Sequence, residues 1–305
     1  MTTEALPLSR RKLWLAAIKP PMYSVAVVPI WVGTAIAAHQ ESAQSTQNHI
    51  NPWIASTFLL SAISIVAWSN VSNDVYDAET GIDQNKHHSL VNLTGNRPLM
   101  FWIGNGLLAL GVLGIVAIAL LQQDFTVLGL VLLCCFLGYL YQGPPFRLGY
   151  KGLGEFLCFF AYGPLALSAV YYSQTKSWSI TVLCASVFLG IITSIILFCS
   201  HFHQVEDDIA AGKRSPIVRL GTKRGAALLP WLCGAAYGSV LLSVILGFMP
   251  VGSLLTLGSL PFAIKLCRFV GQHHDQPQRV NNCKFIAVAL HFWSGLLLGL
   301  GFLLL

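Results

Sequence analysis

Long apolar runs with almost no charge fill most of this 305-residue chain. Hydrophobic residues make up 55% of it and charged residues 10%, whereas soluble domains average about 25% charged residues. About 20 apolar residues in a row are enough for a membrane-spanning helix. Nine runs reach or approach this length: 13–38, 52–71, 100–121, 125–142, 153–172, 178–200, 226–247, 249–270 and 284–305. The sequence therefore predicts an all-α, multi-pass membrane bundle of nine transmembrane helices, because the runs are too long for the alternating strands of a membrane β-barrel.

The basic residues fall on one side of this bundle. With nine helices, seventeen of the eighteen Lys and Arg residues lie in the N-terminal tail, the first span or the even-numbered connections, and the exception is Lys176. Positive residues favour the cytoplasmic side of a membrane, so the N-terminus is predicted to be cytoplasmic and the C-terminus external. The charges are spread over five connections rather than gathered in one patch, so the net charge of +6 indicates topology and no nucleic-acid partner is expected.

Two of the predicted cytoplasmic connections concentrate the acids. The segment from Ser72 to Asp83 holds four of the twelve acidic residues and directly follows the second apolar run. Three more acids, Glu206, Asp207 and Asp208, follow the sixth run. One such cluster is often just a solvated loop, but two clusters on the same side of the bundle favour a site.

The two acidic segments align with each other at a constant offset of 131 residues. The aligned pairs are Asn70 with His201, Asn73 with Gln204, Asp77 with Asp208, and Gly81 with Gly212. This register predicts a single membrane domain over residues 1–305, built from two four-helix halves. The halves are expected at about 13–142 and 153–270, with a ninth helix at 284–305.

The chemistry of these acids indicates a cation site. A charge near the hydrocarbon costs about 2.5–3.5 kcal/mol on insertion scales, so it needs water or a cation. Positions i and i+4 share a helix face, and clustered carboxylate and amide oxygens suit Mg²⁺, whose coordination substrate phosphates often complete. Basic residues beside the acids can bind phosphate oxygens directly: Lys86, Arg97, Lys213 and Arg214. The pattern predicts a site for Mg²⁺ and a diphosphate, and in a membrane that diphosphate most naturally carries an isoprenoid tail.

Four stretches make the chain resemble the UbiA superfamily of intramembrane aromatic prenyltransferases. The first motif of that family, Asn-Asp-x-x-Asp-x-x-x-Asp, is similar to Asn73–Asp77 followed by Asp83, with the last acid two residues late. This delay resembles the MenA branch, as do KPPMYSVAVVPIWVGTA at 19–35 and GKRSPIVRLG at 212–221. The loop YQGPPFRLGYKGLGE at 141–155 resembles the form in phototrophs that make phylloquinone. The resemblance covers nearly the whole chain.

The resemblance implies Mg²⁺-dependent transfer of a prenyl group from its diphosphate to 1,4-dihydroxy-2-naphthoate, with loss of CO₂. Phytyl is the expected tail, and a longer polyprenyl is the alternative. The expected metal ligands are Asn73, Asp74, Asp77, Asp83, Gln204 and Asp208, of which Asp74, Asp77 and Asp208 are also the expected catalytic residues. The expected diphosphate-binding residues are Lys86, Arg97, Lys151, Lys213 and Arg214. The expected substrate-binding residues are Lys19, Trp68, Tyr76, Tyr139, Arg147, Tyr162 and His201, with the aromatic rings facing an allylic cation.

In one place the chain departs from the family. The second motif is usually Asp-x-x-x-Asp, often preceded by Asn. Here Gln204 and His201 stand in those places, and only Asp208 is retained. Either a metal on this side is held with less charge, or Glu206 or Asp207 substitutes for the missing acid.

Two other functions fit parts of the pattern. Homogentisate and chlorophyllide prenyltransferases share the fold and the first motif, although the delayed Asp83 and the 141–155 loop are less like theirs. A secondary transporter also has intramembrane acids and a repeat, but its acids should lie near the membrane midplane and its repeats should be inverted. For the prenyltransferase, the active site is expected to open to the cytoplasmic face of a plasma membrane or a thylakoid.

Overall fold

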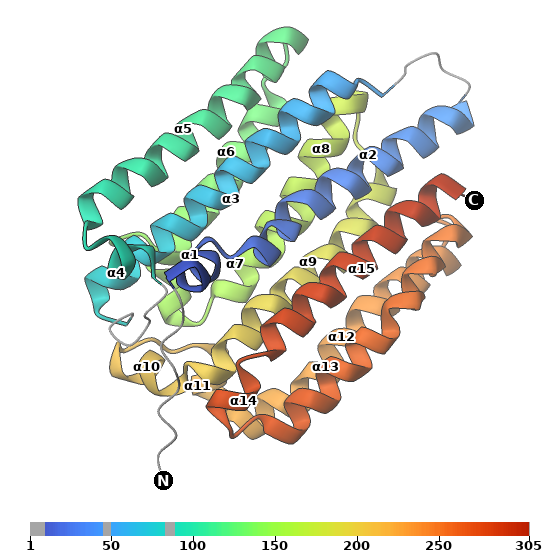
Figure 1. Cartoon of the computed structure of the whole chain (residues 1–305). Coiled ribbons are helices and arrows are strands. Elements are labelled where there is room, and N and C mark those ends of the chain that lie inside the picture. The colour runs from blue at the N-terminus through green and yellow to red at the C-terminus, as the bar shows by residue number, and fades with distance from the viewer. Residues whose placement is uncertain (1–9, 45–49, 83–88, 305) are drawn as a thin grey trace.

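The computed structural model describes residues 10–44, 50–82 and 89–304, and in these ranges the chain forms helices and no strand (Figure 1). Seven long helices run along the bundle: α2 (Ser24–Gln44), α3 (Pro52–Thr80), α5 (Arg97–Gln122), α6 (Thr126–Gln142), α9 (Ile180–Ser200), α12 (Thr222–Ile245) and α15 (Cys283–Leu304). Two further long segments are composite: α7 (Gly154–Phe160), η3 (Ala161–Leu165) and α8 (Ala166–Thr175) form one, and η5 (Val251–Ser259) and α13 (Leu260–His273) form the other. The all-α prediction is confirmed.

Eight of the described segments are long and apolar enough to cross a membrane. They are Arg10–Gln40, Pro52–Thr80, Arg97–Gln122, Gly154–Thr175, Ile180–His203, Thr222–Ile245, Val251–His273 and Pro277–Leu304. The remaining predicted span, α6, is apolar but has only 17 residues. At 1.5 Å per residue it is about 25 Å long, less than the roughly 30 Å of a hydrocarbon core. The chain is an integral membrane protein, while the count of nine spans and the cytoplasmic N-terminus stay predictions.

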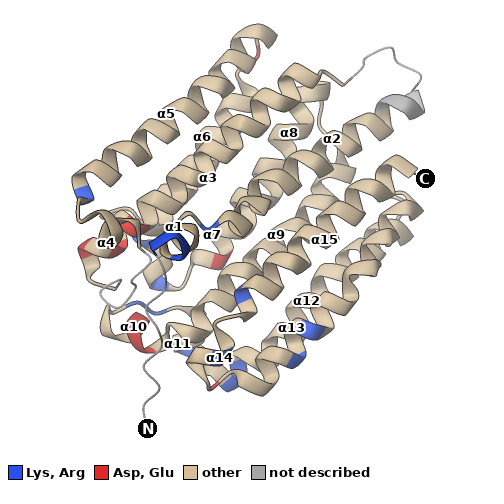
Figure 2. Ribbon diagram, in the orientation of Figure 1, with Lys and Arg blue, Asp and Glu red and all other residues tan. Residues whose placement is uncertain are grey.

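Short helices gather at one end of the bundle. They are α1 (Arg10–Ile18), η1 (Pro20–Tyr23), α4 (Leu90–Thr94), η2 (Leu148–Lys151), η4 (His201–His203), α10 (Val205–Ala210), α11 (Pro216–Leu220) and α14 (Pro277–Val280). Figure 2 shows that Lys, Arg, Asp and Glu also concentrate at this end. The polar chemistry of the molecule is therefore built mainly on short helices and on the ends of long ones.

Local sequence signals decide where α3 begins and ends. The Asn51 side chain caps its first turn by accepting backbone hydrogen bonds. The helix then continues for 29 residues until Gly81, which takes the left-handed conformation with φ 76°. Glycine adopts this conformation without a Cβ clash, so it is a common helix stop. Asp74 and Asp77 consequently lie in the last two turns of α3, at the polar end of the bundle.

Small residues let the long helices approach closely. A Cβ on Gly111 of α5 would lie 2.8 Å from the Ser61 carbonyl oxygen of α3. Gly301 of α15 packs in the same way against the backbone of Gly252 in η5. Close van der Waals packing of this kind drives helix association in lipid, where apolar burial alone gives little. The Gly111 contact helps to hold α3, with its acids, in a defined place.

Candidate functional site

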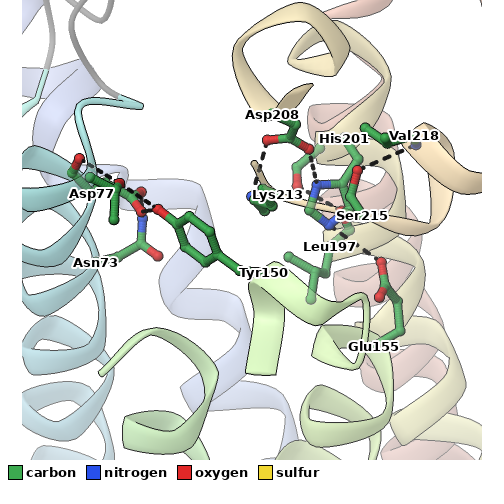
Figure 3. A network of polar contacts seen from close by, with 12 residues as sticks. Asn73, Asp77, Tyr150, Glu155, Leu197, His201, Asp208, Lys213, Ser215 and Val218 are labelled. Carbon is green, nitrogen blue, oxygen red and sulfur yellow. Dashed lines mark hydrogen bonds and ion pairs between the residues drawn. The ribbon is translucent and has the colours of Figure 1, made fainter. Parts of the chain in front are cut away.

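We call the turn of α3 from Asn73 to Asp77 the first acid turn. It lies near the end of α3 and faces η2 (Figure 3). Asn73 donates a side-chain hydrogen bond of 2.6 Å to Asp77, so the two share a helix face as their spacing predicts. The Tyr150 hydroxyl donates to the other Asp77 carboxylate oxygen at 3.1 Å and lies 2.7 Å from the Thr80 hydroxyl. Burial and the charge of Asp77 raise the pKa of Tyr150, so it remains a protonated donor at neutral pH.

We call the turn from Gln204 to Asp208 the second acid turn. It lies at the start of α10, on the other side of η2 (Figure 3). The Asp208 side chain is 0% exposed. One of its oxygens lies 3.2 Å from Lys213 Nζ, and the other lies 3.4 Å from His201 Nδ1. Burial by itself raises the pKa of the Asp208 carboxyl, but the hydrogen bond from His201 and the charge of Lys213 outweigh it, so the pKa lies below its ordinary value. The carboxylate is therefore ionised at neutral pH.

Glu155, which the sequence-based site does not include, joins this second turn. It lies in the first turn of α7, and its carboxylate is 3.4 Å from His201 Nε2. Both Glu155 oxygens are buried and have no hydrogen-bond partner among the described residues. Thus His201 stands between two carboxylates, with Asp208 at its other ring nitrogen (Figure 3). The one sequence signal for this role is an acid at the start of an otherwise apolar run.

Contacts through η2 tie the two acid turns together. The Arg214 backbone N–H donates to the Tyr150 carbonyl at 2.8 Å. The Arg219 guanidinium donates to the carbonyls of Lys151 at 2.8 Å and Arg214 at 3.1 Å. Lys213 Nζ lies 5.7 Å from the centre of the Tyr150 ring. This ammonium group therefore lies between the two acid turns.

The backbone of the two turns matches the predicted register. Gly81 follows Asp77 by four residues and has φ 76°, and Gly212 follows Asp208 by four residues and has φ 71°. Both glycines are left-handed, which ends the helical turn that carries the acid. The two acids thus occupy similar local structures, and the division of the chain into two four-helix halves stays a prediction.

Asp74 makes different contacts from its neighbour Asp77. One of its oxygens pairs with Lys19 Nζ at 3.1 Å, and the other accepts from the Leu90 backbone N–H at 2.9 Å. The Asp74 side chain is fully buried. These contacts tie α3 to the start of α4 and to the residue that joins α1 and η1. The roles of Asp74 in metal binding and of Lys19 in substrate binding stay predictions.

Other predicted basic residues surround the acid turns. Arg97 and Arg147 both pair with Glu79 of α3, Arg147 at 2.9 Å. Lys151 and Arg214 are exposed. These four cations lie at the polar end of the bundle, where a diphosphate can approach from solvent, but Lys213 alone among the predicted diphosphate ligands contacts Asp208 within the described chain.

The remaining residues predicted from the sequence are Gln204, the substitute acid Glu206, Asp83 and Lys86. Gln204 is half-buried at the start of α10. Glu206, proposed from the sequence as a substitute acid, is exposed, and the acid that reaches His201 is Glu155. Asp83 and Lys86 lie outside the described residues.

An apolar cavity of about 100 Å³ lies between α2, α3, α5, α6, η3 and α8. Two of the four predicted aromatic residues, Trp68 and Tyr162, line it. The other two, Tyr76 and Tyr139, form an edge-to-face pair with ring centres 6.3 Å apart. Another lining residue, Ser69, is one helical turn from the first acid turn. On α3, the cavity lining therefore comes within one helical turn of Asn73.

The oxygen donors of the site suit a hard divalent cation. Asn73, Asp77 and Asp208 offer amide and carboxylate oxygens, and both Asp208 oxygens are buried. No three His, Cys, Asp or Glu side chains of the described ranges come together as a complete metal site. Mg²⁺ typically takes one or two carboxylates and completes its shell with waters and substrate phosphates. Two separate acid turns thus fit a metal–diphosphate complex better than a metal bound by protein alone.

Known proteins resemble the chain over nearly its full length. It is 56% identical to the 2-carboxy-1,4-naphthoquinone phytyltransferase of Synechocystis sp. (strain ATCC 27184 / PCC 6803 / Kazusa), covering 98% of each chain. It is 41% identical to the chloroplastic 2-carboxy-1,4-naphthoquinone phytyltransferase of Arabidopsis thaliana, covering 96% of this chain and 77% of that one.

A solved structure and a family match agree with these two relatives. A UbiA homologue from Archaeoglobus fulgidus, solved with GPP and Mg²⁺, superposes with a TM-score of 0.59 at 16% identity, covering 94% of this chain and 99% of that one. Residues 26–302 match the UbiA prenyltransferase family. The chain therefore belongs to the UbiA prenyltransferase family.

Proposed function

We propose that the protein transfers a phytyl group from phytyl diphosphate to 1,4-dihydroxy-2-naphthoate, with release of diphosphate and CO₂. The product is the demethylated precursor of phylloquinone. The observation that carries the proposal is the pair of similar acid turns, with Asp77 and Asp208 on either side of Tyr150 and Lys213. The name shared by the cyanobacterial and plant relatives supports the naphthoate acceptor and the phytyl tail.

A divalent metal belongs to this proposal. Structures of the Archaeoglobus homologue contain Mg²⁺ or Cd²⁺, which supports a divalent ion, and the oxygen-rich donors here favour Mg²⁺. Asn73, Asp77 and Asp208 are the residues that would hold it. When bound, the ion supplies positive charge that stabilises the departing diphosphate.

The cations of the chain supply the remaining charge. Lys213 lies between the acid turns, where its ammonium group can donate to a diphosphate oxygen. Tyr150 holds the Asp77 carboxylate in place from η2. Arg147 lies at the same end of the bundle, paired with Glu79. Because these groups are ordered before the substrate arrives, stabilising the leaving group requires little reorganisation.

The bond changes balance without an oxidant. The bond between C1 of the tail and the diphosphate oxygen breaks, leaving an allylic cation that the rings of Trp68 and Tyr162 can face. The carboxyl-bearing ring carbon of the naphthoate attacks C1, since the two ring hydroxyls make that ring electron-rich. The bond from this carbon to the carboxylate then breaks, CO₂ leaves, and the electron pair returns to the ring as the quinol.

The membrane location follows from the tail. The apolar cavity beside the site gives the tail a water-free path, and exclusion of water also protects a cation from hydrolysis. The one-sided charge supports an active site that opens to the cytoplasmic face of a plasma membrane or a thylakoid.

The test is a product-mass assay with purified protein in lipid, given 1,4-dihydroxy-2-naphthoate, phytyl diphosphate and Mg²⁺. The expected product is a phytylated naphthoquinol without the carboxyl group, and EDTA should abolish it. Asp77→Ala and Asp208→Ala are each expected to lower kcat/KM about a hundredfold or more, because each removes a carboxylate that would hold the metal ion stabilising the departing diphosphate. Asp124→Ala, at the other end of the bundle, is the control and should retain activity.

Two results would contradict the proposal. Full activity of folded Asp77→Ala and Asp208→Ala proteins would reject the metal–diphosphate site. Activity with homogentisate but not with the naphthoate would keep the enzyme class and replace the acceptor.

A further inference from the structure

We infer that Phe58 sets the length of the prenyl tail that the protein accepts, by closing the far end of the apolar cavity. The inference rests on the proposed function and adds to it a residue that determines donor specificity.

The cavity runs along α3, away from the acid turns. Its α3 lining extends from Ser69 to Phe58, and Ala62 lies between them. At 1.5 Å per residue, Ser69 is about 12 Å and Phe58 about 28 Å along the helix from Asp77. A tail whose diphosphate binds beside Asp77 therefore meets the near end of the cavity first and Phe58 last.

Four buried side chains from four helices line that far end. They are Phe58 of α3, Ile115 of α5, Val131 of α6 and Val170 of α8, and each is at most 6% exposed. All four belong to one apolar cluster. Phe58 is the largest of them, so truncating it opens the most space.

The available length suits a phytyl tail. About sixteen of its carbons lie in line, which extends about 19 Å at roughly 1.25 Å per bond. The remaining distance to Phe58, about 9 Å of the helical rise, is taken up by the diphosphate and its cation. An extended octaprenyl tail of about 39 Å would run past Phe58.

The volume of the cavity is consistent with this placement. About 100 Å³ corresponds to roughly seven to ten water positions, so the cavity holds the distal part of the tail rather than all of it. The proximal part lies between Ser69 and the acid turns, beside Trp68 and Tyr162. A different path, in which the tail leaves sideways into lipid, would make its length unimportant and is the competing outcome.

The experiment measures kcat/KM for geranyl, phytyl, hexaprenyl and octaprenyl diphosphates, with 1,4-dihydroxy-2-naphthoate and Mg²⁺, using purified protein in lipid vesicles. Phe58→Ala is expected to raise the value for hexaprenyl relative to phytyl diphosphate about tenfold or more, because hydrophobic pockets discriminate size on this scale. Val131→Phe shortens the cavity and should lower phytyl relative to geranyl diphosphate by about as much. The control, Ile118→Ala, removes a buried residue of the same cluster that does not line the cavity, and should leave the ratios unchanged.

The outcomes separate the tail stop from the reaction. Opposite shifts in the two cavity variants support the stop, because loss of fold cannot produce both. Wild-type activity on phytyl diphosphate with unchanged ratios in both variants would overturn the stop and leave the proposed function intact. Wild-type protein that is inactive with every donor would overturn the proposed function, and the stop with it.

Discussion

At the residue scale, His201 connects the second acid turn, where Gln204 stands in the place of an acid, to a further carboxylate. Its ring nitrogens lie 3.4 Å from Glu155 and 3.4 Å from Asp208. A neutral imidazole has a single N–H, so it can donate to only one of the two carboxylates. Through this contact, α7 adds the Glu155 carboxylate to the surroundings of the second acid turn.

Replacing Glu155 by Gln tests this arrangement. The change keeps the size of the side chain and removes the charge beside His201, which in turn contacts the expected metal ligand Asp208. The Mg²⁺ concentration for half-maximal activity should therefore rise about tenfold to a hundredfold, as for other groups that orient metal ligands. The measurement is a Mg²⁺ titration of activity, with thermal unfolding followed in parallel. The matched control is Glu206→Gln, an exposed acid of α10. Equal Mg²⁺ requirements in the two variants would rule out a positioning role for Glu155.

At the element scale, one predicted helix proves to be three segments. The run at 153–172 contains η3, a π-helical turn around Pro164. Proline lacks the backbone N–H that a regular helix needs, and π-turns often mark functional sites. Here Ala161 and Tyr162 of this turn line the cavity. Periodicity predicted the helix but not this turn, because local irregularity leaves the apolar pattern unchanged.

The junction between η2 and the segment after α10 is a second element-scale feature. Gly152 has φ 75°, and a Cβ there would lie 2.6 Å from the Arg214 carbonyl oxygen. We expect Gly152→Ala to lower the free energy of unfolding by about 1–3 kcal/mol and to reduce kcat/KM, because it strains the backbone and separates the two acid turns. Thermal unfolding in detergent and steady-state kinetics measure both effects.

Gly234 of α12 provides the control for this substitution. A Cβ at Gly234 meets no atom within 4 Å. Alanine there should be neutral or stabilising by up to about 1 kcal/mol, since alanine suits a helix better than glycine does. If Gly152→Ala unfolds at the same temperature as Gly234→Ala, the junction does not hold the turns together.

At the scale of the whole molecule, the protein concentrates its charges toward one end of an apolar bundle. This follows from the cost of charge in hydrocarbon, which confines ionisable groups to the membrane surfaces or to wet sites. Which surface carries the site depends on the number of spans, and α6 is the helix that decides the count because it is short.

Cysteine labelling measures the topology. Gln123, between α5 and α6, and Lys223, at the start of α12, are both exposed. With nine spans they lie on opposite sides, so a membrane-impermeant maleimide should label Lys223→Cys only in inside-out vesicles and Gln123→Cys only in right-side-out vesicles. Unsubstituted protein is the control, since its native cysteines are buried or half-buried. Labelling of both variants from the same side would show that α6 does not cross the membrane, and reversed sides would place the N-terminus outside.

Properties of single segments could be read from the sequence of this protein. The apolar length of the runs predicts membrane helices, and eight described segments are long and apolar enough to cross a membrane. The i, i+4 spacing places Asn73 beside Asp77 whatever surrounds them. The paired glycines, Gly81 and Gly212, likewise mark the ends of the two acid turns because left-handed backbone is a local requirement. The motifs and their order also identified the family, which residues 26–302 match.

Only the tertiary structure decided which segments meet. Tyr150 reaches Asp77, and Glu155 reaches His201, because η2 and the start of α7 fold between the ends of α3 and α9. The cavity that ends at Phe58 likewise needs side chains from several helices packed at once. Spacing along one helix predicts a shared face, but contacts between helices depend on packing, and in lipid that packing is set by small residues and shape rather than by apolar pattern.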